Sequence, residues 1–180
     1  VCSSDLSYRT APKWSVNGKW AVMYDPIAQV WNKFDGATGK VVNISDAIGY
    51  PMFMESYDKP APAPAYGIAG WTADGNNVFL YDAYDWWKID LTGERQPECL
   101  TKGYGRKHGK SIRKMTSNID KDVFQKDEKV IVSLWDKDTM DEGVYQLDMK
   151  GRLRKLMEGN YVYTIHRFSD NHEYCVWNRQ

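Results

Sequence analysis

The sequence predicts an all-β fold: a partial β-propeller of about three to four blades, each a four-stranded antiparallel sheet. Two observations favour it. Short strand-like runs and tight turns recur in the same order along the 180 residues, and aromatic content reaches 14%, with 8 Trp and 12 Tyr, which suits pleated, half-buried surfaces. Such sheets expose two apolar faces that only neighbouring sheets can cover, and radial stacking is common for repeats of about 40 to 50 residues.

The first repeat opens on Trp14-Ser15-Val16-Asn17-Gly18. Asn and Gly tolerate the positive φ that a type I′ hairpin turn requires, so a hairpin is expected here. Strand-like runs follow at Trp20–Tyr24 and Val30–Asp35, the second alternating apolar and polar residues until Gly36-Ala37-Thr38-Gly39 breaks it. A short closing strand is expected from Val41, Val42 and Ile44.

The second repeat follows this order, because Trp71-Thr72-Ala73-Asp74-Gly75 matches the first turn 57 positions later. Strands are predicted at Val78–Tyr81 and Trp86–Leu91, a turn at Thr92-Gly93, and a closing strand at Cys99-Leu100-Thr101. The proline-rich stretch Lys59–Pro64 lacks backbone donors, which favours an extended connector between the repeats.

Two looser repeats follow. The third is predicted to have strands at Lys129–Leu134 and Gly143–Asp148, with the turn Lys150-Gly151 and the closing strand Arg154-Lys155-Leu156. The fourth begins at Phe168-Ser169-Asp170-Asn171, has His172 in place of the turn glycine, and continues into Tyr174–Trp177.

The first six residues, Val1–Leu6, resemble the translated end of a sequencing adapter. We therefore expect residues 1–6 to be a non-native assembly scar and residues 7–180 to be an incomplete propeller domain from a longer chain.

Charge is balanced at 24 basic and 24 acidic residues, which argues against nucleic acid or an acidic membrane surface as a partner. No apolar run approaches the length of a membrane-spanning helix. The three cysteines, Cys2, Cys99 and Cys175, lack metal-site spacing.

Between Tyr66 and Lys107 the sequence resembles the propeller of the prolyl oligopeptidase family of serine peptidases (S9 type), with greatest similarity to the bacterial dipeptidyl and acylaminoacyl peptidase branch. The residues that carry the resemblance are Tyr66-Gly67-Ile68-Ala69-Gly70-Trp71, Tyr81-Asp82, Asp85-Trp86-Trp87-Lys88-Ile89-Asp90, Leu100-Thr101 and Gly103-Tyr104-Gly105-Arg106-Lys107.

The resemblance implies a propeller that limits entry of short peptides to a C-terminal α/β-hydrolase domain of the same chain. That domain would hold the catalytic residues, and the present residues contain no G-x-S-x-G motif. We therefore assign no catalytic, cofactor-binding or metal-binding residue to this segment, and expect peptide substrates and the hydrolase domain as its partners. A periplasmic or secreted location is only what this bacterial branch suggests. The alternative is a standalone propeller that binds a protein or glycan.

Conceivable nucleophiles and bases lack the strand-turn-helix setting that activates a hydroxyl, so no self-contained triad is expected. They are Ser15, Ser45, Ser111, Ser117, Ser133, Ser169, His108, His166 and His172. A group of carboxylates fails the EF-hand spacing and is interpreted as a solvated turn rather than a calcium site; it comprises Asp136, Asp138, Asp141 and Glu142.

A basic stretch is interpreted as a charged, glycine-rich loop rather than a phosphate site; it contains Lys102, Arg106, Lys107, Lys110, Arg113 and Lys114. Tyr81, Tyr84, Trp86 and Trp87 could form a stacking platform. Because Trp86 and Trp87 occupy adjacent strand positions, they must face opposite sides, and at least one is expected in the core. Asp82 and Asp85 are expected to accept hydrogen bonds from turn backbone groups.

Overall fold

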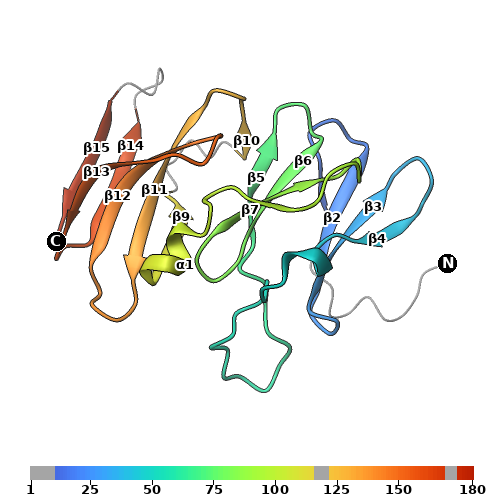
Figure 1. The fold of residues 1–180 in the computed structure, drawn as a ribbon, viewed down its shortest axis with the longest axis horizontal. Coiled ribbons are helices and arrows are strands. Elements are labelled where there is room, and N and C mark those ends of the chain that lie inside the picture. The colour runs from blue at the N-terminus through green and yellow to red at the C-terminus, as the bar shows by residue number, and fades with distance from the viewer. Residues whose placement is uncertain (1–10, 116–121, 169–173) are drawn as a thin grey trace. The chain divides into compact units, whose positions relative to one another are not determined.

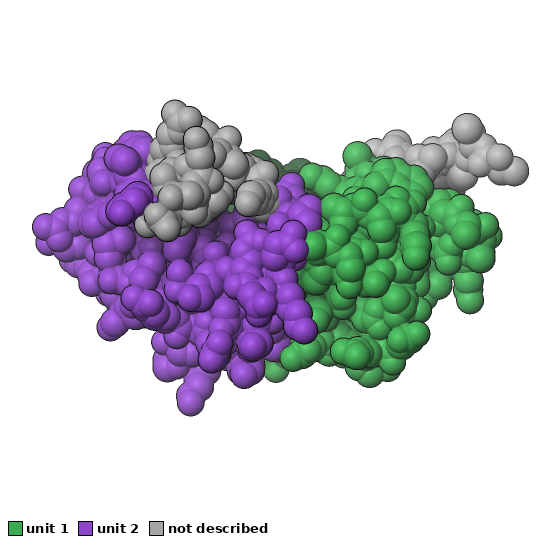
Figure 2. Space-filling view, turned by 90° about the horizontal axis from the view of Figure 1, so that it is seen from above, with its two compact units in different colours: residues 1–83, 87–98 green, residues 84–86, 99–180 purple. Residues whose placement is uncertain are grey.

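The computed structural model describes residues 11–115, 122–168 and 174–180. The chain divides into two compact units: residues 1–83 with 87–98 form unit 1, and residues 84–86 with 99–180 form unit 2 (Figure 2). Residues 1–6, expected to be a non-native scar, lie outside the described residues. No helix in the described part of the chain is long and apolar enough to cross a membrane.

Unit 1 begins with a four-stranded antiparallel sheet whose strands follow the chain order (Figure 1). Its strands are β1 (Lys13–Trp14), β2 (Trp20–Asp25), β3 (Val30–Asp35) and β4 (Val41–Asn43). A 3-10 turn, η2 (Asp46–Ile48), follows the last strand. This chain-ordered meander is the expected topology of a propeller blade.

The second sheet has the same meander order in β5 (Ile68–Thr72), β6 (Asn77–Tyr81), β7 (Trp86–Asp90) and β8 (Glu98–Cys99). Between the two sheets the chain makes a loop over residues 54–64. An isolated bridge between Phe53 and Ala65 and a hydrogen bond from Met54 N–H to Pro64 C=O (2.9 Å) close its base. The proline-rich connector is therefore confined to this loop.

The 57-residue repeat is visible in the hydrogen bonds of the two hairpin turns. In the first turn, Ser15 Oγ donates to Asn17 Oδ1 (2.7 Å), and Lys19 N–H donates to the same oxygen (3.1 Å). The same pair of bonds recurs in the second turn, where Thr72 Oγ1 (2.5 Å) and Asn76 N–H (2.9 Å) both donate to Asp74 Oδ1. Side chains of different chemistry, a hydroxyl with an amide or a carboxylate, thus build one turn geometry twice.

The two turns also contact each other. Asn17 Nδ2 donates to the C=O of Asp74 (2.9 Å), and a Cβ added to Gly75 would lie 2.7 Å from Asn17 Cγ. Gly18 and Gly75 both have φ of +69°, whereas Asn17 does not have a positive φ. The predicted hairpin is confirmed, but the type I′ assignment is wrong, because that turn requires positive φ at both central residues. Asn17 instead uses its side chain to organise the turn.

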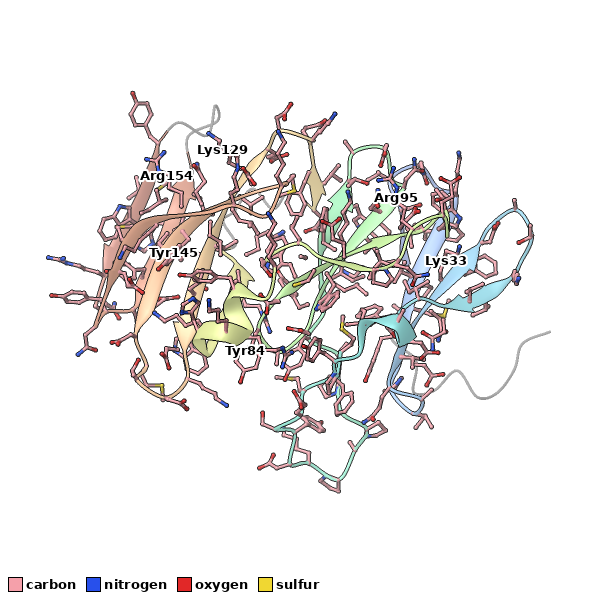
Figure 3. All side chains as sticks on the ribbon, in the orientation of Figure 1. Lys33, Tyr84, Arg95, Lys129, Tyr145 and Arg154 are labelled. Atoms are coloured by element: carbon pink, nitrogen blue, oxygen red, sulfur yellow. The ribbon has the colours of Figure 1, made fainter. Side chains whose placement is uncertain are left out.

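The two sheets of unit 1 stack face to face through a buried apolar cluster. The first sheet supplies Val22, Tyr24 and Trp31, and the second supplies Trp71, Val78, Leu80, Ile89 and Leu91. At the edge of the cluster, Lys33 Nζ donates to the C=O of Leu91 (2.7 Å; Lys33 is labelled in Figure 3). Unit 1 therefore contains two stacked blade-type sheets, as the repeat predicts.

Unit 2 contains a further four-stranded antiparallel sheet, in the order β13-β12-β11-β9. Its strands are β9 (Lys110–Lys114), β11 (Lys129–Asp136), β12 (Glu142–Asp148) and β13 (Leu153–Gly159). The short helix α1 (Tyr104–His108) precedes it. The two-residue strand β10 (Val123–Phe124) follows β9 in the chain but is not part of this sheet, in which β9 pairs directly with β11. A hairpin of β14 (Tyr163–Phe168) and β15 (Cys175–Arg179) ends the chain.

The predicted fold class, all-β with four-stranded antiparallel sheets, is confirmed, and the strands expected in the third repeat are present. The basic stretch is not the loop that was predicted, because its residues form α1 and β9. The error arose because Gly103 and Gly109, which suggested a loop, instead flank the helix with φ of +70° and +66°. The turn of the fourth repeat, with Ser169 and His172, lies outside the described residues.

A glycine pair tests the contact between the repeated turns. Gly75→Ala should lower the free energy of unfolding by about 2 kcal/mol, because it combines a strained positive φ with a clash against Asn17. Gly39→Ala is the matched control, since its φ is +70° and nothing lies within 4 Å of the added Cβ, so only the φ cost of about 1 kcal/mol applies. Urea denaturation measures both; equal losses would show that the turn contact contributes nothing.

Candidate functional site

A pocket of about 250 Å³ lies at one end of the first sheet, in unit 1. The β2–β3 hairpin and the connector that leaves β4 form its walls. Its lining residues are Gln29, Val30, Ser45, Asp46, Gly49, Tyr50, Pro51 and Met52. Apolar side chains thus meet an amide, a carboxylate and a phenol, a composition typical of small recognition sites.

The connector is held in place by a polar turn centred on Asn43. Its Oδ1 accepts hydrogen bonds from the N–H groups of Ser45 (2.9 Å) and Asp46 (3.2 Å), and its Nδ2 donates to Asp46 Oδ1 (2.7 Å). Ser45 Oγ in turn accepts the N–H of Trp31 (2.9 Å) in β3. The sequence Asn43-Ile44-Ser45-Asp46 therefore fixes the pocket wall to the sheet by local side-chain to backbone bonds.

Aromatic residues extend this site. The Tyr50 ring lies 6.0 Å from the Trp87 ring, and the Tyr50 side chain remains 45% exposed. Trp87 Nε1 donates to Asp82 Oδ2 (3.0 Å), and Asp82 is buried. A buried carboxylate therefore fixes the orientation of the indole, and Tyr50 presents an accessible aromatic surface beside the pocket. Together they offer van der Waals and stacking contacts to a ligand, not covalent chemistry.

Sequence reasoning missed this site. It considered Tyr81, Tyr84, Trp86 and Trp87 as a platform but did not include Tyr50, which no strand pattern marks. The available signal was the Asn43 turn followed by Gly49-Tyr50-Pro51. The prediction that adjacent tryptophans face opposite sides is confirmed: Trp86 is fully buried in unit 2, where its Nε1 donates to Ile112 C=O (3.1 Å), and Trp87 packs against the cluster of unit 1.

Asp85 accepts hydrogen bonds from backbone groups of α1, which the prediction for the turn did not include. Its carboxylate, 1% exposed, accepts hydrogen bonds from the N–H groups of Gly105 (2.9 Å) and Arg106 (3.0 Å) and from Thr101 Oγ1 (2.6 Å). These donors belong to α1 and to the residues before it. The Arg106 guanidinium lies 5.0 Å from the ring centre of Tyr84 (labelled in Figure 3). Asp85 therefore anchors α1, a structural role.

A second polar cluster in unit 2 is centred on Glu158. Its carboxylate accepts hydrogen bonds from Lys110 Nζ (2.7 Å), Lys155 Nζ (3.0 Å) and the Tyr145 hydroxyl (3.2 Å; Tyr145 is labelled in Figure 3). The Lys110 hydrogen bond, and then that of Lys155, lowers the pKa of Glu158 to about 2, and the same bond raises the pKa of Lys110. Burial is the main reason that the pKa of Tyr145 is raised, so its phenol stays protonated and donates.

Gly143 makes this arrangement possible. A Cβ at this position would lie 2.6 Å from Tyr145 Cε2, so the tyrosine ring occupies the space over the glycine. Lys110 pairs with the Glu158 carboxylate, which it shares with Lys155, so its ammonium group is engaged within the sheet rather than presented to an anion. A further ion pair in this unit joins Lys114 to Asp122 (3.0 Å).

The described serines do not form a nucleophile–base pair with a described histidine. Ser15 Oγ and Ser45 Oγ both donate to neighbouring asparagine side chains, and Ser111 Oγ donates to Trp135 C=O (3.4 Å). His108 packs against Tyr104, with ring centres 4.3 Å apart. Ser117, Ser169 and His172 lie outside the described residues, so the prediction made for them stays a prediction.

The carboxylates after β11 form the predicted turn. Asp136 Oδ1 accepts the N–H groups of Asp138 (2.9 Å) and Thr139 (3.2 Å), which lowers the pKa of Asp136. In the first sheet, Asp25 Oδ1 likewise accepts the N–H groups of Ile27 (3.0 Å) and Ala28 (3.1 Å). Among the described residues, no group of three His, Cys, Asp or Glu side chains is arranged to hold a metal ion.

No protein-family model matches the sequence, and no curated protein matches it. Among solved structures, the fold is similar to that of regucalcin, a calcium-binding protein from Agrobacterium tumefaciens strain C58, at 10% sequence identity and a TM-score of 0.37. The similarity covers 83% of this chain and 43% of regucalcin, so this chain spans less than half of that protein's length. So weak a similarity says nothing about ligands or activity.

The Glu158 cluster predicts a pH dependence of stability. The lowered pKa stabilises the folded state above the pKa of an unfolded glutamate, about 4.3, and this contribution is lost as the pH falls towards about 2. Glu158→Gln should therefore cost about 1 kcal/mol at pH 7, and its stability should fall less steeply than that of the native chain between about pH 5 and pH 2.

Urea denaturation at a series of pH values checks this. Glu94→Gln, an exposed glutamate in the turn after β7, is the control and should keep the native pH profile. If the profile of Glu158→Gln ran parallel to that of the native chain, the lysine pair would not be stabilising the carboxylate.

Proposed function

We propose that this chain is the substrate-selecting propeller portion of a serine peptidase of the prolyl oligopeptidase type, and that it recognises short peptides without taking part in bond cleavage. The observation that carries the proposal is the pocket beside Tyr50, which sits on a blade-type repeat of the kind expected from the sequence. The residues of the second repeat that resemble this peptidase family support the same function.

The pocket suits a peptide side chain in size and chemistry. Its volume of about 250 Å³ accommodates one or two residues, and its floor includes buried Met52 beside partly buried Val30 and Pro51. Gln29 and Asp46 are exposed at the rim and supply an amide and a carboxylate for the polar groups of a peptide. The catalytic serine, aspartate and histidine would then belong to a hydrolase domain of the same protein.

One feature favours a second candidate, a standalone binding module. Tyr50 and Trp87 present aromatic surface next to polar side chains, the combination that also binds sugar rings. A glycan would then occupy the same pocket, and no hydrolase domain would be required.

Sequencing the gene on both sides of the region that encodes these residues separates the two candidates. The peptidase proposal expects further blades and a downstream domain with a G-x-S-x-G nucleophile elbow. A gene that completes the propeller and encodes no hydrolase domain would refute it and leave the binding module.

Peptide binding to the chain itself provides the second test. Isothermal titration with tetrapeptides that contain one large apolar residue should show binding, and Tyr50→Ala should weaken it about tenfold, because a centrally placed aromatic contact typically contributes more than 1 kcal/mol. Tyr161→Ala is the matched control: this tyrosine of unit 2 is 43% exposed, against 45% for Tyr50, and its loss should leave the affinity unchanged. Equal effects of the two substitutions, or binding of oligosaccharides in place of peptides, would contradict the proposal.

A further inference from the structure

The pocket beside Tyr50 is acidic. Among the described residues that line it, Asp46 alone has a charged side chain, and neither a lysine nor an arginine is present. The amide of Gln29 and the phenol of Tyr50 are uncharged, and each has an oxygen that can accept a hydrogen bond. The pocket is therefore complementary in charge to a cation and unfavourable for an anion.

Asp46 is held in place by hydrogen bonds that leave its charge available. Its N–H donates to Asn43 Oδ1 (3.2 Å), and its Oδ1 accepts a hydrogen bond from Asn43 Nδ2 (2.7 Å). The asparagine amide is neutral, and the ion pairs found among the described residues involve other carboxylates. The exposed Asp46 side chain is thus oriented before any ligand binds, with Oδ2 directed to no cation of the described chain.

Gln29 supplies a second acceptor from the other wall of the pocket, the β2–β3 hairpin. Its φ is +58°, in the left-handed region, where the matching turn after β3 has Gly39 with φ of +70°. The two turns match because each begins with an aspartate, Asp25 or Asp35, whose Oδ1 accepts the N–H groups two and three positions later. A side chain at this φ carries a strain that glycine avoids, and strain retained at a pocket is typical of a functional residue.

The apolar part of the pocket suits a long aliphatic stem. Met52 is buried, and Val30 and Pro51 are partly buried. Lysine and arginine pack their stems on such surfaces while their charged ends reach polar groups. The accessible ring of Tyr50 offers an aromatic face to the same cation. The pocket therefore combines contacts for a stem with acceptors for the charge that the stem carries.

We infer that the pocket selects peptides in which a lysine or arginine is next to a large apolar residue, and that Asp46 Oδ2 and the Gln29 amide oxygen receive the cation. The aliphatic stem and the apolar neighbour share the floor around Met52, for which a volume of about 250 Å³ is sufficient. This inference rests on the proposed recognition of peptides and narrows its substrate class.

Isothermal titration with acetylated and amidated tetrapeptides of sequence Ala-Leu-X-Ala tests the selection, with lysine, glutamine or glutamate at X. The blocked ends carry no charge, so the peptides differ only in the charge at X. The lysine peptide should bind about threefold more tightly than the glutamine peptide, and the glutamate peptide should bind most weakly. About 0.5 M NaCl should remove these differences, because salt screens a contact at an exposed rim.

Two substitutions locate the contact. Asp46→Asn keeps an acceptor for Asn43 and removes the charge, so it should abolish the preference for lysine. Asp58→Asn is the matched control: this aspartate is exposed in the loop over residues 54–64 and does not line the pocket, so the preference should remain.

Gln29→Gly retains the left-handed turn and removes the amide, so it should weaken binding of the lysine peptide about threefold. Met140→Gly is its control, because Met140 has φ of +63° in a turn of unit 2 that begins with Asp136 in the same way. That substitution should leave the affinity unchanged.

The outcomes separate this inference from the proposed function. Equal affinities of the native chain for the three peptides, or a preference for glutamate, would overturn the inference and leave peptide recognition standing. A preference lost equally in Asp46→Asn and Asp58→Asn would also overturn it, because the effect would then come from net charge and not from a contact. If no peptide bound at all, the inference and the proposed function would both be refuted.

Discussion

The packing of the first sheet against the second is the interaction on which the rest of unit 1 depends. Neither sheet has enough apolar residues on both faces to form a core by itself, because its strands have six residues at most. Stacking joins Tyr24 and Trp31 of one sheet to Trp71 and Leu80 of the other, and these residues are 5% exposed or less. Removing these apolar side chains from water stabilises the fold by about 25 cal/mol per Å² of buried apolar surface. This gain offsets the conformational entropy lost when the two short meanders become ordered.

Most of the fold could be predicted from the sequence because the repeat is carried by backbone-directing residues. Gly18 and Gly75 set the same φ in both turns, and a hydroxyl beside an amide or carboxylate completes each one. The residues Asn17 and Gly18 alone did not determine the turn type. Asn17 keeps a negative φ, and its side chain stabilises the turn by accepting hydrogen bonds. The helix α1 was missed for a related reason: Asp85 accepts the N–H groups of Gly105 and Arg106 in its first turn, 20 and 21 residues further along the chain.

The candidate site was not predicted, because the turn at Asn43 and the residues Gly49-Tyr50-Pro51 lie in a connector that has neither a strand pattern nor a catalytic signature. The Tyr50 ring packs against the Trp87 ring, and a hydrogen bond to buried Asp82 sets the orientation of Trp87. The sequence analysis placed Trp87 in the predicted strand Trp86–Leu91 and Asp82 in the turn before it, and it predicted that at least one of Trp86 and Trp87 lies in the core. It had no means of bringing a connector residue from before the second repeat to the same place.

The loop over residues 54–64 illustrates how such an architecture can change without losing its fold. The Phe53–Ala65 bridge and the hydrogen bond from Met54 N–H to Pro64 C=O hold its two ends together. The distance between the two ends therefore stays fixed whatever the length of the loop. The entropic cost of lengthening a loop with fixed ends grows only logarithmically, by about 0.6 kcal/mol per doubling. This position is thus where foreign segments, such as an epitope or a reporter domain, can be grafted next to the pocket with little penalty to folding.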